Sequence, residues 1–93
     1  MNSFGEYLRN RREEVGFPLR KVAAELDIDT SILSKIERNE RSATKEIIPI
    51  LAELLETSEQ EMEIEFIKSN ILTDLGSLKH LKKGLTKTLD SLK

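Results

Sequence analysis

The chain has 93 residues, of which 38% are hydrophobic and 34% are charged, and it contains no cysteine. This length allows one small domain with an appended helix and excludes a two-domain enzyme. The composition is typical of neither a disordered tail nor a membrane protein, and without cysteine no disulfide can reinforce the core. We expect a soluble protein of the reducing cytoplasm, because the first residues lack the basic start and apolar stretch of a secretory signal.

The formal net charge of −2 hides an uneven distribution of charge along the chain. Residues 1–49 carry nine basic and nine acidic side chains, whereas residues 50–70 carry six glutamates against one lysine. Residues 71–93 carry five lysines against two aspartates. Because attraction to phosphate depends on the charge of the contacting face, the slightly acidic total does not exclude a nucleic-acid partner.

Helical periodicity runs through the whole chain and predicts an all-α fold. Ser3 and Glu6 form a capping box that begins the first helix. This helix should run to Val15, because Gly16 can supply the positive φ of a helix end.

The next two predicted helices are joined by a very short break. Pro18 is tolerated only in a first turn, so a second helix begins near it and extends to Leu26. Residues 27–29 form the break, and Asp29 is a good N-cap for a third helix over residues 30–38. A break this short fixes the angle at which the two helices cross.

The predicted helix over residues 30–38 has one apolar and one polar side. Ile32, Leu33 and Ile36 share the apolar side. The other side is a continuous polar stripe of Thr30, Ser31, Ser34, Lys35 and Arg38. A capped helix with a polar outer face behind a tight turn is the geometry of a DNA-reading element, since an α-helix fits the ~12 Å major groove.

The remaining chain predicts three further helices. The fourth spans about residues 44–56, with Pro49 bending it or delaying its start. A second capping box, Ser58 to Glu61, opens the fifth helix, and Gly76-Ser77 is the next break. A leucine stripe begins at Leu78 and predicts a last amphipathic helix. An isolated helix of ~15 residues has marginal stability in water, so its apolar face must pack against another surface. We expect a homodimer contact, with packing back onto the same chain as the alternative; its predicted residues are Phe66, Ile67, Ile71, Leu78, Leu81, Leu85 and Leu89.

The pattern of residues 4–57 resembles the helix-turn-helix domain of the Xre/Cro type, found in phage repressors and many small bacterial regulators. Ala23 falls where that family needs close helix crossing, and the run from Leu33 to Arg38 looks like the end of its recognition helix. The other residues at the family's core positions are Val22, Leu26, Ile28 and Ile36. Three departures are Leu19 in place of a phosphate-binding glutamine, and Asp27 and Asn39 in place of glycines.

The resemblance implies a fold, a domain division and a set of functional residues. The fold is all-α, a five-helix lambda-repressor-like DNA-binding domain with an additional C-terminal amphipathic helix. Residues 1–57 would form the helix-turn-helix domain and residues 58–93 a helical extension for dimerisation. Arg12 and Glu37 would form an ion pair. Base contacts would come from Thr30, Ser31, Ile32, Ser34 and Lys35, and phosphate contacts from Arg20, Lys21, Arg38, Arg41 and Lys45.

The leading hypothesis is a transcriptional regulator that binds a palindromic operator in double-stranded DNA as a homodimer. An autoregulatory controller of a restriction-modification system fits this description, as do an antitoxin and a phage-type repressor. The alternative is a protein-interaction module with weak or no DNA reading, which the acidic segment and Leu19 favour. Its partner would be a toxin or the transcription machinery.

Catalysis, metal binding and membrane binding find no support in the sequence. The only histidine, His80, has no cysteine and no obvious carboxylate partner, so we expect no enzyme and no metal site. The four glycines are isolated and form no phosphate-binding loop, so no cofactor is expected. The basic stretch of residues 79–87 lacks the aromatic residues of a membrane-surface helix.

Overall fold

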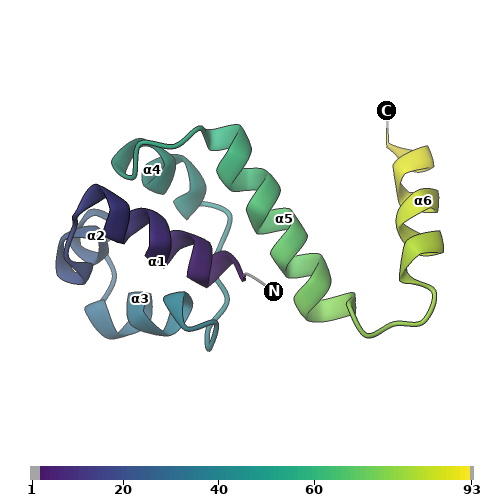
Figure 1. The fold of residues 1–93 in the computed structure, drawn as a ribbon, viewed down its shortest axis with the longest axis horizontal. Helices are drawn as coiled ribbons and strands as arrows, with labels where there is room; N and C mark the ends of the chain where they lie inside the picture. Colours follow the sequence, from purple (N-terminus) through teal and green to yellow (C-terminus); the bar gives the residue numbers. More distant parts are fainter. Residues whose placement is uncertain (1–2, 93) are drawn as a thin grey trace.

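The structure is a computed structural model that describes residues 3–92, and within this range all regular secondary structure is helical. Figure 1 shows a body built from the first five helices and a last helix that stands apart from it. The helices are α1 (Phe4–Val15), α2 (Leu19–Glu25), α3 (Thr30–Glu37), α4 (Ile47–Leu54), α5 (Glu59–Leu75) and α6 (Leu81–Ser91). The predicted all-α fold with an additional C-terminal helix is confirmed.

Helix α1 begins and ends where its capping residues predict. The Ser3 hydroxyl accepts a hydrogen bond of 3.1 Å from the Glu6 N–H. At the other end Gly16 adopts a left-handed conformation with φ 87°, and its N–H donates to the carbonyls of Arg12 and Glu13. Helix α2 follows Pro18 directly and ends at Glu25, one residue before its predicted end.

The turn between α2 and α3 contains a residue in the left-handed region. Asp27 has φ 56° there, at the position where the family often has glycine. Asp29 is the N-cap residue of α3, but its side chain makes no capping hydrogen bond, contrary to our expectation. Asp29 is exposed, and its backbone carbonyl accepts a hydrogen bond of 3.2 Å from the N–H of Leu33. Asn39 follows α3 with φ 62°, as its tolerance of this conformation predicts.

Helix α4 is shorter than the predicted span of residues 44–56. It begins at Ile47 and ends at Leu54, so Pro49 lies in its first turn, where a proline costs no intrahelical hydrogen bond. The delayed start is one of the two outcomes that the proline predicts. The end of the helix is capped from outside, because the Arg11 guanidinium donates to the carbonyls of Leu55 at 2.7 Å and Glu56 at 2.9 Å.

The core lies between α1 and the helices around it. Helix α1 packs against α3 on one side and α5 on the other, and α5 also packs against α4. The largest fully buried side chains are Leu8, Leu33, Leu51, Leu55, Met62 and Val22. Helix α5 is tied to the start of α1 by a hydrogen bond of 3.0 Å from the Phe4 N–H to the Ser69 hydroxyl, and Ser58 caps its start as predicted.

Two features of the C-terminal half differ from the sequence prediction. Phe66, expected at a dimer contact, packs edge-on against Phe4 of its own chain with ring centroids 5.3 Å apart. Helix α6 begins at Leu81, three residues later than expected, because residues 76–80 form turns in which the Leu78 N–H donates to Leu75 and the Leu81 N–H donates to Leu78. No residue of α6 is buried, and the helix extends the molecule to 41 Å along its longest axis.

Candidate nucleic-acid interface

Helix α3 separates its apolar and polar residues as the sequence predicts. Leu33 and Ile36 are buried in the core, whereas Thr30, Ser31 and Lys35 are exposed. The two remaining candidates for base contacts are only half-buried: Ser34 lies at the edge of the exposed face, and Ile32 packs partly against the core. Ile32 therefore has part of its side chain free for an apolar contact.

The end of α3 lies against the backbone of α1 at Gly5. A Cβ atom placed on Gly5 would come within 2.7 Å of the Glu37 carbonyl oxygen and still closer to that of Ile36. Only glycine permits this approach, because carbon and oxygen atoms that are not bonded cannot come so near. Gly5 is not among the residues predicted above, and its only signal in the sequence is a glycine inside an otherwise helical pattern.

The predicted ion pair between Arg12 and Glu37 is present and largely buried. Arg12 donates to the two carboxylate oxygens of Glu37 from Nε at 2.8 Å and from Nη2 at 3.0 Å, and a third hydrogen bond of 2.9 Å reaches the carbonyl of Phe17. The hydrogen bond to Glu37 raises the pKa of Arg12, so the guanidinium remains charged at physiological pH. With Gly5, this pair clamps α3 to α1 through its inner face.

Five exposed basic side chains lie on the segments that adjoin α3 in the sequence. Arg20 and Lys21 lie in the first turn of α2, and Arg41 and Lys45 lie in the loop between α3 and α4. Arg38 follows α3 and pairs with Glu40 at 3.2 Å, but both side chains are more than half exposed. Such a surface pair is worth little and can be exchanged for a phosphate contact. All five predicted phosphate ligands are thus accessible.

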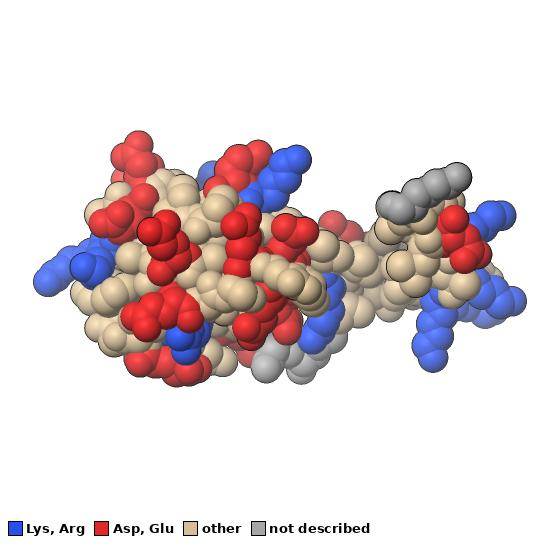
Figure 2. Space-filling model, turned by 90° about the horizontal axis from the view of Figure 1, so that it is seen from above, with Lys and Arg blue, Asp and Glu red and all other residues tan. Residues whose placement is uncertain are grey.

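The acidic side chains visible from above lie on the opposite side of the body from α3. Figure 2 is seen from above, and Asp and Glu (red) outnumber Lys and Arg (blue) over the body on that side. In Figure 1, α3 lies at the bottom of the same body. Many of the acidic side chains therefore lie on a face other than that of α3, which makes a negative total charge compatible with phosphate binding at α3.

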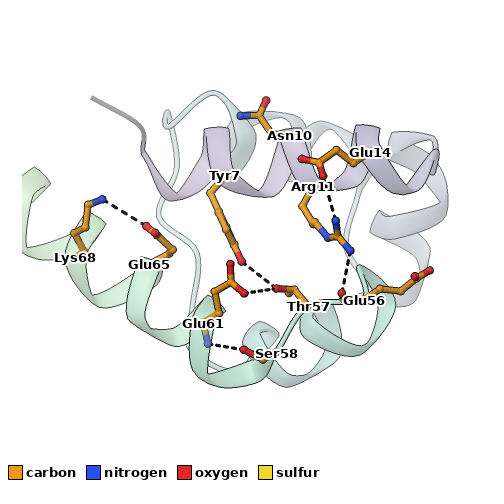
Figure 3. Close-up of a pocket in the computed structure, with 10 residues that line it drawn as sticks. All are labelled: Tyr7, Asn10, Arg11, Glu14, Glu56, Thr57, Ser58, Glu61, Glu65 and Lys68. Carbon is orange, nitrogen blue, oxygen red and sulfur yellow. Dashed lines mark hydrogen bonds and ion pairs between the residues drawn. The ribbon is translucent and has the colours of Figure 1, made fainter.

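A polar cleft lies between α1 and the start of α5 (Figure 3). The Tyr7 hydroxyl is 3.3 Å from that of Thr57, which donates to Glu61 at 3.4 Å, and Arg11 is held by Glu14 and by the end of α4. These hydrogen bonds join α1 to the turn between α4 and α5. We interpret the cleft as part of the scaffold, because most of the polar groups that line it are bonded within the chain.

Within residues 3–92, no three carboxylate or histidine side chains lie together in a group that could hold a metal ion. Likewise, no helix in that range combines the length and hydropathy that crossing a bilayer requires.

The fold and the exposed face of α3 define a class of protein. Two helices joined by a tight turn, with the second presented outward and clamped from behind, form a helix-turn-helix DNA-binding domain. The helix-turn-helix family model matches residues 8–62, more than half of the chain, and the protein belongs to this family of DNA-binding transcription regulators. Comparisons with curated proteins and with solved structures found no match.

Proposed function

We propose that the protein regulates transcription as a homodimer that binds a two-fold symmetric operator in double-stranded DNA. The observation that carries this proposal is the outer face of α3, where Thr30, Ser31 and Lys35 are exposed together on a helix anchored from behind. One such helix offers too few contacts for specific binding. Two copies would place their α3 helices in successive major grooves ~34 Å apart. A regulator of this kind works in the cytoplasm.

We assign base and phosphate contacts to different residues. Bases are contacted by Thr30, Ser31, Ile32, Ser34 and Lys35, with Ile32 meeting a thymine methyl group. Phosphates are contacted by Arg20, Lys21, Arg38, Arg41 and Lys45. A dimer that neutralises about ten phosphates, five from each copy, should bind DNA with a slope of log K against log salt of about −9. A slope near zero in a salt titration by gel shift would contradict the assignment.

Two substitutions separate these roles. Lys35→Ala should weaken binding to the best site about 5- to 150-fold and relax discrimination at one base pair, whereas Arg41→Ala should weaken all sequences about equally. The control is Arg9→Ala, which removes a positive charge from an exposed position of α1 to which no DNA or dimer contact is assigned, and it should leave the affinity unchanged. Identical behaviour of the Lys35 and Arg41 variants in binding to randomised sites would show that the division of roles is wrong.

We also propose that residues 58–93 supply the dimer contact. Leu78 and Leu89 are exposed large apolar residues of this segment, and Leu81 and Leu85 are half-buried on the same stripe. Leu89→Asp should therefore produce monomers in sedimentation without changing the fold of α1–α5. A dimer of unchanged stability would place the interface elsewhere.

The regulated system is proposed to be the protein's own operon, as in a restriction-modification controller. Adjacent methyltransferase and endonuclease genes would support this, whereas an adjacent toxin gene would favour an antitoxin. A second candidate, a protein-interaction module, is favoured by the acidic face in Figure 2. Selection from a pool of random DNA sequences distinguishes the two, because a pure interaction module would enrich no motif.

A further inference from the structure

Helix α5 has a second apolar face on the side turned away from the core. Ile64, Ile67, Ile71 and Leu75 recur at spacings of three and four residues, roughly opposite the buried Met62 and Ser69. Ile64 is 54% exposed and Ile67 is 48% exposed. We call these four residues the α5 stripe. Large apolar residues repeated along one exposed helix face mark a surface that another helix covers.

Helix α6 carries a matching face that its own chain covers only in part, at Leu81 and Leu85. Leu81, Leu85, Leu89 and Leu92 form the α6 stripe, and both Leu89 and Leu92 are 68% exposed. Figure 1 shows α6 standing apart from α5, beyond the turns of residues 76–80. An isolated helix of 11 residues is unstable in water, so α6 needs a partner surface.

We propose that the α6 stripe of each chain packs on the α5 stripe of a second copy, so that two chains exchange their last helices reciprocally. This packing rests on the homodimer proposed above and specifies which helix contacts which.

Charge favours this pairing over the two pairings of like helices. Helix α5 carries the acidic residues Glu59, Glu61, Glu63, Glu65 and Asp74 against one lysine, Lys68. Helix α6 carries three lysines against one aspartate. Two α5 helices side by side would bring carboxylates together, and two α6 helices would bring lysines together, whereas α5 beside α6 brings opposite charges together.

The edges of the two stripes favour α6 of a second copy over α6 of the same chain. Viewed down a helix axis from the N-terminus, each apolar stripe has two edges, one on its clockwise side and one on its counterclockwise side. Lys82 flanks the α6 stripe on one of these sides. Glu63 and Asp74 flank the α5 stripe on the opposite side. When two helices pack through such stripes, opposite edges lie next to each other only if the helices are parallel, as with the flanking positions of a parallel coiled coil. The five residues of the connection, 76–80, allow α6 to fold back on its own α5 only in the antiparallel direction, which brings Lys82 to the side of Lys68. A second copy can supply the parallel helix.

Two charge-reversed chains test the exchange. One is Lys82→Glu, which makes the residues flanking both stripes acidic, and the other is Glu63→Lys/Asp74→Lys, which makes them basic. All three residues are exposed, so the helices remain intact. Each variant alone should dimerise about tenfold more weakly than the native chain, because the side chains that flank the two stripes then repel one another. An equimolar mixture should recover near-native affinity as a heterodimer, measured by native mass spectrometry from the difference in mass.

A chain that carries all three substitutions should dimerise with itself as the native chain does, which shows that the reversed residues do not damage the fold. Failure of the mixture to form heterodimers would overturn the proposal in favour of α6 folding back on its own chain. Variants that each dimerise as well as the native chain would overturn it in favour of another interface. A gel shift with the native protein distinguishes failure of the proposed function from failure of the helix exchange. Native dimers that bind no DNA would contradict operator binding. DNA binding by the native protein, together with a mixture that forms no heterodimers, would contradict only the exchange.

Discussion

Replacement of Arg12 by methionine should destabilise the domain by about 4 kcal/mol. The change leaves the Glu37 carboxylate without its partner while its side chain is only 6% exposed. Removing one member of a buried pair costs about 3 to 5 kcal/mol, because the remaining charge is buried and uncompensated. The carbonyl of Phe17 also loses its 2.9 Å hydrogen bond, at a cost of about 1 kcal/mol. For a domain of this size, whose total stability is ~5 to 14 kcal/mol, Tm should fall by about 15 to 30 °C.

A double-mutant cycle measured by urea unfolding checks the origin of this loss. Arg12→Met combined with Glu37→Met should cost less than Arg12→Met alone, because no buried charge remains. The matched control is Arg9→Met, which breaks the pair of Arg9 with Glu13; those side chains are 57% and 55% exposed, and the cost should stay below about 1 kcal/mol. Costs of the Arg12 and Glu37 variants that simply add in the double variant, or a cost for Arg12→Met no larger than that of the control, would refute the argument.

Three further changes probe the packing around α3 and the start of α1. Gly5→Ala should destabilise the domain by about 2 kcal/mol or more in urea unfolding, because the new methyl group meets the carbonyls at the end of α3; native stability would show that α1 can move aside. Asp27→Gly should stabilise it by roughly 0.5 to 1 kcal/mol, since residue 27 has φ 56°, and a loss in thermal melts would mean that the aspartate side chain contributes more than the strain costs. Ser69→Ala should cost about 1 to 3 kcal/mol by leaving the buried N–H of Phe4 unpaired, and faster hydrogen exchange at that amide is the specific readout, absent if water replaces the hydroxyl.

Local signals in the sequence predict local structure well in this protein. The bounds of α1 follow from Ser3 and Gly16, because a cap acts on backbone groups three or four residues away. The capping box at Ser58 predicts the start of α5 for the same reason. The outer face of α3 follows from helical periodicity alone.

Contacts between distant residues were not predictable in the same way. Phe4 and Ser69 are 65 positions apart, and no residue pattern indicates that a serine hydroxyl on α5 caps the start of α1. Arg11 likewise caps α4 from 44 positions away. The Arg12 to Glu37 pair was predicted only through the family resemblance, which carries tertiary information that periodicity lacks. Phe66 was assigned to a dimer contact because its apolar character does not reveal which of two apolar faces of α5 meets the core.

The residues that attach α3 to the domain differ from those proposed to contact DNA bases, so stability and sequence specificity depend on different positions. Its anchors, Gly5 and Glu37, lie behind the helix, while positions 30, 31 and 35 touch neither of them. A duplicated gene could therefore drift toward a new operator by single substitutions at those outward positions, without passing through a misfolded ancestor. Changes at the anchors would instead eliminate the protein whichever DNA it had come to prefer.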